Sequence, residues 1–222
     1  MTDITRVSRY GLVNCYLVPE EDGLTLVDTM LPRSGKAILA AAERAGAPIK
    51  RIALTHGHGD HIGALDELAA ALPGVEVIIS ARDARLLDKD KSLDPGEPSS
   101  KVRGGVPGAK TTPTRTVADG DRIGSLQVIA SPGHTPGHVA FLDVRDQTLL
   151  CGDVYTTLGT VSTTAQRNLR FPLATMATWD RPTELASARM LAELDAARLA
   201  PGHGRIVEAP RAAMEAALAR AK

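Results

Sequence analysis

The segment 55–61, with the sequence THGHGDH, constrains this chain more than any other feature. It places four side chains that can bind metal within six residues, and it holds three of the six histidines of the 222-residue chain. The other three are His134 and His138, in PGHTPGH, and His203, in PGHG. Histidine is thus confined to turns marked by glycine and proline. We expect the fold to bring these turns together at one metal centre.

Composition narrows the class of protein. Apolar residues make up 43% of the chain, which is enough for a sizeable core, and 26 basic residues balance 26 acidic ones. The zero net charge argues against a nucleic-acid partner, and no apolar run is long enough for a signal peptide or a membrane span. Cys15 and Cys151 lie among apolar neighbours and are interpreted as buried thiols. We expect a cytoplasmic protein with one domain over residues 1–222.

Strand and helix patterns alternate along the chain, which is typical of α/β folds. Strands are predicted at 11–19, 24–28, 52–54, 75–79, 127–130, 139–144 and 148–150, and helices at 34–45, 62–72, 81–87, 182–199 and 210–221. Two stretches lack periodicity, 88–115 and 155–180, and stretches of that length are usually functional lids or disordered loops. Most candidate ligands follow a predicted strand, where open α/β folds place their sites.

The spacing within 55–61 suits two neighbouring ions. His56 and His58, two residues apart at an extended strand end, point the same way. The chain can then turn at Gly59, so that Asp60 and His61 face an adjacent position. One short loop could offer two ligands to each of two ions.

Three residues further along the chain can complete these pairs. A distant histidine would add the third ligand to each ion, His134 to the first and His203 to the second. Asp153 has two carboxylate oxygens and could bridge both ions. Seven candidate ligands exceed the four of a closed structural zinc site.

The pattern His56-x-His58-x-Asp60-His61, followed by the three later ligands, resembles the ligand set of the metallo-β-lactamase superfamily. The resemblance extends from Asp28 to the last histidine. It implies an α/β fold, a four-layer αββα sandwich with a binuclear centre at its edge. The implied ligands are His56, His58 and His134 for metal one, Asp60, His61 and His203 for metal two, and Asp153 as the bridge. Asp28 is implied to support the site from behind the ligands.

Within the superfamily, classical β-lactamases lack an aspartate bridge at this place, so Asp153 makes the site resemble the glyoxalase II, lactonase and persulfide dioxygenase branches. Lactonases of this fold can carry a tyrosine three residues after the bridge, whereas Tyr155 comes two residues after it. Tyr155 is therefore interpreted either as a substrate contact or as a packing residue. His138 has no place in the ligand set and is expected to contact the ligands or to be structural.

The resemblance implies a metallo-hydrolase, in which a hydroxide held by two divalent ions attacks an ester, thioester or lactone carbonyl. Zinc is expected, with manganese or iron as alternatives. Asp60 is expected to be catalytic as well as a ligand. A mononuclear-iron persulfide dioxygenase, with iron on His56, His134 and Asp153, is the first alternative, and a non-catalytic metal-dependent binding protein is the second. The partner is a small-molecule substrate, and oligomeric state is left open.

Two aromatic residues in the second irregular stretch have two interpretations. Phe171 and Trp179 either line a pocket or anchor the loop. Specificity is expected to lie in the two irregular stretches, because loops on a rigid scaffold usually carry it.

Overall fold

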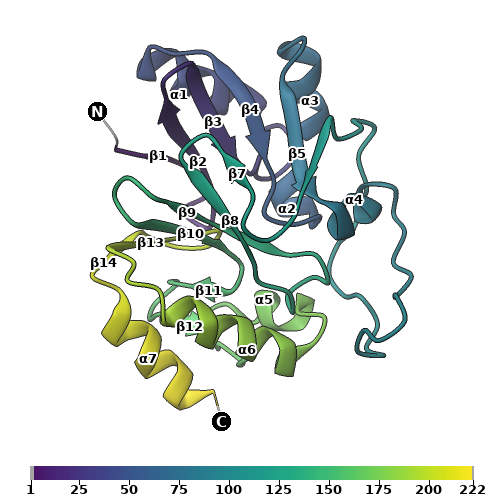
Figure 1. The fold of residues 1–222 in the computed structure, drawn as a ribbon, viewed down its shortest axis with the longest axis vertical. Helices are drawn as coiled ribbons and strands as arrows, with labels where there is room; N and C mark the ends of the chain where they lie inside the picture. The colour runs from purple at the N-terminus through teal and green to yellow at the C-terminus, as the bar shows by residue number, and fades with distance from the viewer. Residues whose placement is uncertain (1–2, 222) are drawn as a thin grey trace.

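Residues 3–221 are described in the structure, a computed structural model, and form four layers in which two sheets lie between two sets of helices (Figure 1). The first sheet has the strand order β1-β2-β3-β4-β5-β6. Its strands are β1 (Thr5–Arg9), β2 (Val13–Glu20), β3 (Gly23–Val27), β4 (Ile49–Ala53), β5 (Glu76–Ser80) and β6 (Arg115–Val117). From β3 to β6 neighbouring strands are parallel.

The second sheet has the order β14-β13-β10-β9-β8-β7. Its strands are β7 (Arg122–Ile123), β8 (Leu126–Ala130), β9 (Val139–Asp143), β10 (Thr148–Gly152), β13 (Arg198–Pro201) and β14 (Val207–Glu208). Only β10 and β13 pair in parallel in this sheet. A small third sheet joins β11 (Tyr155–Thr156) to β12 (Ser162–Thr163).

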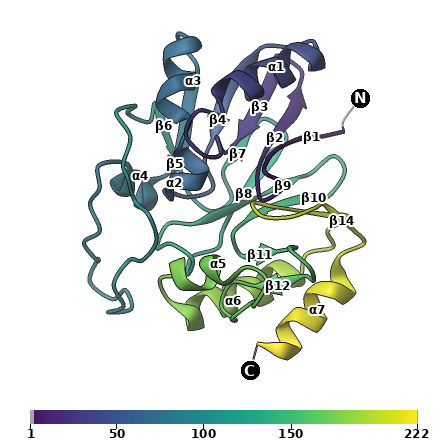
Figure 2. The ribbon, with the colours of Figure 1, turned by 180° about the vertical axis from the view of Figure 1, so that it is seen from behind.

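The helices cover the outer faces of the two sheets. Those beside the first sheet are α1 (Gly35–Ala45), α2 (Gly59–Ile62), α3 (Leu65–Ala71) and α4 (Ala81–Leu87), and those beside the second are α5 (Pro172–Ala177), α6 (Arg181–Ala192) and α7 (Arg211–Arg220). Figure 2 shows the two groups on opposite sides of the paired sheets. No helix within residues 3–221 combines the length and the apolar character that crossing a membrane requires.

Three buried clusters hold the layers together. Ile38 of α1 and Leu68 of α3 pack on the first sheet, and Phe141 of β9 lies in a cluster between the sheets. Leu191 of α6 and Met214 of α7 pack on the second sheet. All five side chains are almost fully buried, so aliphatic residues fill a core in which aromatic residues are scarce.

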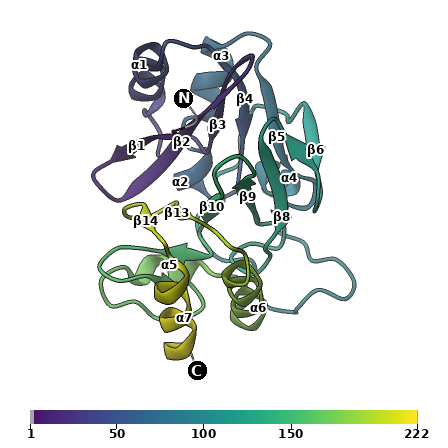
Figure 3. The same ribbon diagram turned by 60° about the vertical axis from the view of Figure 1, so that its left-hand side comes forward.

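Two pairs of parallel strands, β3 with β4 in the first sheet and β10 with β13 in the second, end at one edge of the sandwich (Figure 3). Strands β3, β4, β10 and β13 end there, each directly before a candidate site segment. Two backbone hydrogen bonds link segments at this edge, one of them from the start of β9. The Val139 amide donates to the Thr55 carbonyl over 2.9 Å, and the Gly202 amide donates to the Gly152 carbonyl over 2.8 Å. The prediction that the ligands gather at strand ends matches this geometry.

The predicted helix 182–199 is wrong at its carboxyl end. Helix α6 stops at Ala192, and Arg198–Pro201 forms β13 instead. The Leu199 side chain is fully buried, and its backbone pairs with Leu149 of β10. Sheet pairing therefore outweighs the helical spacing of leucines, which is a local signal.

The irregular stretch 88–115 has no helix or strand before β6, but its chain is tied down along its length. Arg82 of α4 binds Glu97 with an Nε–Oε1 distance of 2.7 Å. The Thr111 amide donates to Asp66 over 2.8 Å, and the Trp179 indole donates to the Ser100 carbonyl. The stretch 88–115 therefore follows an ordered path around α4.

Asp83 connects two of the candidate site segments. It is fully buried in the first turn of α4. Its carboxylate accepts hydrogen bonds from the Gly57 amide (2.9 Å), the Thr135 hydroxyl (2.6 Å) and the Gly137 amide (2.7 Å). The segments around residues 57 and 135 are therefore held together by one side chain that the sequence pattern did not single out.

Replacing Asp83 with alanine should lower the free energy of unfolding by about 3 kcal/mol, because three buried donors would lose their acceptor. Urea denaturation followed by circular dichroism measures this change. Asp88→Ala, an exposed carboxylate at the other end of α4, is the matched control and should change stability by less than about 0.5 kcal/mol. Equal effects of the two substitutions would contradict the linking role.

Candidate metal centre

The His-rich loop leaves β4 in an extended conformation and then turns into α2. His58, at the amino end of α2, is still extended, with φ −76° and ψ 149°. From Gly59 onward the chain turns as a helix, so Asp60 and His61 extend from α2, and the His61 ring lies against His56 with ring centroids 4.1 Å apart. His56 and His61 are fully buried, and the Asp60 side chain keeps 34% of its exposure.

The first cluster consists of three ring nitrogens that face one point. His56 Nε2 and His58 Nδ1 are 3.1 Å apart, and His58 Nδ1 and His134 Nε2 are 3.0 Å apart. Nitrogen ligands about 2.0–2.1 Å from a tetrahedral zinc ion lie roughly 3.3 Å from one another. The three nitrogens are therefore spaced like ligands of one ion.

The second cluster contains Asp60, His61 and His203. The Asp60 Oδ2 atom is 3.4 Å from His203 Nε2 and 4.0 Å from His61 Nε2. This cluster is wider than the first and lies beside it. The structure thus brings together both ligand triplets that the resemblance implied.

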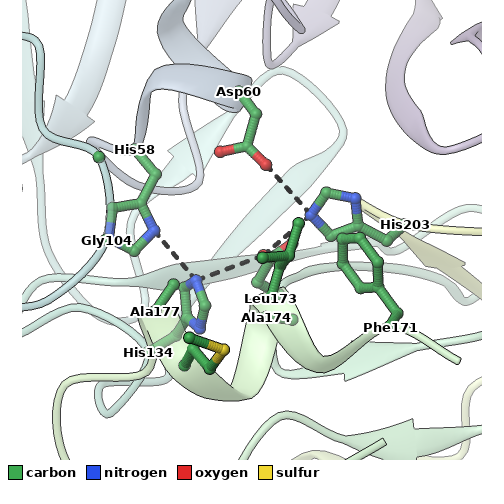
Figure 4. Close-up of a pocket in the computed structure, with 12 residues that line it drawn as sticks. His58, Asp60, Gly104, His134, Phe171, Leu173, Ala174, Ala177 and His203 are labelled. Atoms are coloured by element: carbon green, nitrogen blue, oxygen red, sulfur yellow. Dashed lines mark hydrogen bonds and ion pairs between the residues drawn. The ribbon is translucent and has the colours of Figure 1, made fainter. Parts of the chain in front are cut away.

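Asp153 lies between the clusters, directly after β10. Its Oδ2 is 3.3 Å from His134 Nε2 in the first cluster and 3.1 Å from His203 Nε2 in the second. Its Oδ1 is 3.2 Å from His61 Nε2. Figure 4 shows Asp60, His58, His134 and His203 pointing toward one another. One carboxylate therefore reaches ligands of both clusters, as a bridging ligand must.

Each candidate ring has an inner nitrogen that faces the centre and an outer nitrogen that faces away from it. Three of the histidines donate a hydrogen bond from the outer nitrogen to a carbonyl or carboxylate oxygen. His58 Nε2 donates to the Arg103 carbonyl over 3.0 Å, and His203 Nδ1 donates to the Leu12 carbonyl over 3.0 Å. His61 Nδ1 donates to a carboxylate oxygen of Asp28 over 2.8 Å. A proton is therefore fixed on each outer nitrogen, and the inner nitrogen is left to bind a metal.

In the other two rings, His56 and His134, the outer nitrogen donates to a threonine hydroxyl. The Thr55 hydroxyl donates to Asp28 over 2.8 Å, so Thr55 Oγ1 accepts from His56 Nδ1 at 3.0 Å. The Thr178 hydroxyl is directed to backbone carbonyls and accepts from His134 Nδ1 at 3.1 Å. In all five rings the outer nitrogen is thus held by a hydrogen bond, and the inner nitrogen faces the centre.

Burial and charge give the two clusters different protonation. Burial is the main cause that lowers the pKa of His56 and His134 well below the usual histidine range, so both rings are neutral. Burial also acts on His61 and His203, but carboxylates, Asp153 first, outweigh it. The pKa of His61 lies well above its usual range, and that of His203 is about 9. These two rings carry protons that a bound cation would displace.

The carboxylates are ionised. Burial alone would raise the pKa of Asp153, but the charges of His203 and His61 lower it well below its usual range. Burial likewise opposes ionisation of Asp60, and the charge of His61 holds its pKa below the usual value. Among residues 3–221, the buried atoms His61 Nε2 and Asp153 Oδ1 have no hydrogen bond of good geometry, and they face each other as an ion pair at 3.2 Å. Imidazoles that are neutral or can release a proton to a bound cation, together with these anionic oxygens, form a donor set that fits two divalent ions.

Two predicted supporting residues contact the ligands. Asp28 accepts from His61, as above, and also from the Thr55 amide over 2.8 Å. His138 Nε2 accepts from the Asp153 amide over 3.1 Å, and its Nδ1 is 2.9 Å from the Ser131 hydroxyl. Both nitrogens of His138 are therefore occupied, which leaves none for a metal.

Tyr155 lies away from the ligands. It is fully buried in the cluster beneath the second sheet, and its hydroxyl donates to the Ala188 carbonyl over 2.6 Å. It does not line the pocket above the clusters. Of the two interpretations of Tyr155, the structure agrees with packing and not with substrate contact.

A pocket of about 300 Å³ opens above the two clusters. Its lining residues are His58, Asp60, Gly104, Gly105, His134, Asp153, Phe171, Leu173, Ala174, Met176, Ala177 and His203. The Phe171 ring lies against His203, with ring centroids 4.6 Å apart. Trp179, in contrast, is buried, and its indole anchors the stretch 88–115 by donating to the Ser100 carbonyl. Both irregular stretches therefore contribute walls to the pocket.

Comparison with known proteins gives a family match over residues 9–203, to the Metallo-beta-lactamase superfamily. The uncharacterized protein YobT of Bacillus subtilis (strain 168) is 43% identical over 211 residues, which cover 95% of this chain and 91% of that protein. A hydroxyacylglutathione hydrolase of Rhodospirillum rubrum is 36% identical over 132 residues. That match covers 58% of this chain and 42% of the enzyme.

Solved structures share the fold. TTHA1623, crystallised in a di-iron-bound form, aligns with a TM-score of 0.68 and 27% identity over 93% of this chain and 96% of its own. The B3 metallo-beta-lactamase BLEG-1 aligns with a TM-score of 0.71 and 21% identity over 94% of this chain and 95% of its own, which shows a shared fold alone. The family match spans most of the chain and agrees with its four layers, so this chain belongs to the metallo-beta-lactamase superfamily.

Proposed function

We propose that this chain is a binuclear metal-dependent hydrolase of an ester, thioester or lactone. The observation that carries the proposal is the position of Asp153, whose carboxylate reaches His134 of one cluster and His61 and His203 of the other within 3.3 Å. The names of several relatives, hydroxyacylglutathione hydrolase and probable metallo-hydrolase among them, support hydrolysis.

In this proposal the first ion would bind the first cluster, the second ion would bind the second cluster, and Asp153 would contact both. The proposed ligands are His56, His58 and His134 for the first, Asp60, His61 and His203 for the second, and Asp153 for both. When bound, such a pair of ions lowers the pKa of water toward about 7 and polarises a carbonyl oxygen. We propose zinc as the metal, and a small molecule as the substrate.

Asp60 is the proposed proton acceptor. Its side chain is the most exposed of the seven proposed ligands and lines the pocket. The charge of His61 keeps its pKa below the usual value, against the effect of burial, so it is ionised at neutral pH. An ionised carboxylate at the pocket floor can orient an attacking water and accept its proton.

A count of metal per chain tests the two-ion arrangement. Protein purified without added metal should contain about two ions per chain by elemental mass spectrometry. His203→Ala should reduce the count to about one, because the second cluster loses a ligand while the first is intact. Arg205→Ala, an exposed neighbour in the same loop, should leave the count unchanged. A single iron per chain in the wild type would contradict the proposal and favour the dioxygenase alternative.

Removing the Asp60 carboxylate tests the catalytic step. Asp60→Ala should lower kcat for ester or thioester hydrolysis at least about 100-fold, the usual contribution of a positioned acid or base. The folded structure should persist, because the side chain lies at the pocket surface. Thermal unfolding checks the fold, and Asp195→Ala, an exposed carboxylate, serves as the control. Wild-type turnover in Asp60→Ala would refute the role. A metal-loaded wild type without turnover on any ester, thioester or lactone would favour a binding protein.

A further inference from the structure

Two large apolar side chains are exposed at the mouth of the metal-site pocket. Leu173 and Met176 are each 63% exposed, and both line the pocket. They are three residues apart on the short helix α5, so they lie on the same face of that helix. Exposed apolar side chains that gather at one cavity are typical of a binding surface.

The apolar surface continues from these two residues toward the proposed ligands. Phe171, Ala174 and Ala177 also line the pocket, and Figure 4 shows them with Leu173 beside His134 and His203. Together these five residues form what we call the α5 wall: Phe171, Leu173, Ala174, Met176 and Ala177. Six helical residues extend about 9 Å, which is long enough to contact an acyl chain of several carbons.

Apart from the proposed ligands and the α5 wall, the pocket is lined by two glycines, which have no polar side chain. Gly104 and Gly105 present backbone alone. Gly104 has φ +75°, and a Cβ atom there would lie 2.4 Å from His58 Nε2, so the position cannot easily carry a larger residue. Recognition beyond the ligands therefore falls to the α5 wall.

Within the described residues 3–221, no lysine or arginine lines the pocket. Arg170 lies against Gly159, Arg167 and Arg205 line separate depressions, and Arg103 offers its backbone carbonyl to His58 while its side chain is exposed. A substrate with carboxylates, such as a glutathione conjugate, would find no cation here beyond the metal site itself. An anionic tail placed on the α5 wall would lose hydration without a partner.

We propose that the α5 wall binds an uncharged apolar acyl chain, so that the substrates are neutral medium-chain esters or thioesters and not anionic conjugates. This inference rests on the proposed hydrolase function and names its substrate class. The chain would lie along Leu173 and Met176 while its carbonyl faces Asp60 and Asp153.

Three methyl esters of matched design test the proposal on the metal-loaded enzyme. Methyl hexanoate has an apolar six-carbon chain, monomethyl adipate has the same chain length with a terminal carboxylate, and methyl acetate has almost no chain. The expected kcat/KM for hexanoate exceeds that for each of the others at least about tenfold, the scale of apolar pocket discrimination. Equal or faster hydrolysis of the adipate monoester, or no dependence on chain length, overturns the inference while the hydrolase function stands.

A double variant and a matched control test whether the α5 wall causes the preference for hexanoate. The double substitution Leu173→Ser and Met176→Ser should lower the hexanoate-to-acetate ratio of kcat/KM roughly tenfold. Leu169→Ser is the matched control, because Leu169 is 82% exposed in the same stretch but does not line the pocket. The same loss of ratio in the control, or an unchanged ratio in the double variant, counts against the α5 wall.

A binding measurement separates failure of the inference from failure of the function. The ketone 3-octanone has the acyl chain of methyl hexanoate but cannot be hydrolysed. By calorimetry it should bind the wild type at least about tenfold more tightly than the double variant. If no ester is hydrolysed but this difference appears, the proposed function fails and the apolar site is supported. If esters are hydrolysed but 3-octanone binds both proteins equally, the inference fails alone.

Discussion

The candidate metal centre depends on hydrogen bonds that hold each proposed ligand ring from the side facing away from the centre. Five imidazoles converge within a largely buried edge of the sandwich, and each would lose solvation without a partner for its outer nitrogen. Asp28, Thr55, Thr178 and the carbonyls of Arg103 and Leu12 supply those partners. The surrounding protein thereby fixes the orientation and the tautomer of each ring. The spacing between the inner nitrogens therefore does not depend on a bound metal ion.

These partners come from distant parts of the chain, which explains what sequence analysis could and could not predict. The residues that gather in the two clusters were predictable, because the spacing of His56, His58, Asp60 and His61 is local and the family resemblance supplied the rest; their binding of metal stays a prediction. The α/β four-layer fold was predicted correctly for the same reason. Asp83 was missed, since its three partners are contacts of the folded structure. A signal existed: the pair Ser80 and Asp83, three residues apart at a strand end, resembles a helix cap, and Ser80 does accept from the Asp83 amide.

Regions without strong periodicity were the least predictable. The end of the 182–199 helix failed because pairing with β10 is a long-range interaction. The order in 88–115 comes from ion pairs with α4 and from Trp179, which no local pattern encodes. The edge strands β1, β6, β7 and β14 were not predicted. Strands β6, β7 and β14 have only two or three residues, and β1 is largely exposed, so these strands carry little sequence signal. The single domain over 1–222 stays a prediction.

The proposed ligands come from both sheets, and this has a consequence for folding. The His-rich loop extends from the first sheet, whereas His134, Asp153 and His203 extend from segments of the second. Ions bound there would join the sheets across a long span of sequence, much as a cross-link does, and would favour the folded chain over the unfolded one. In the cell, metal supply would then control how much of this protein survives proteolysis as well as how much of it is active.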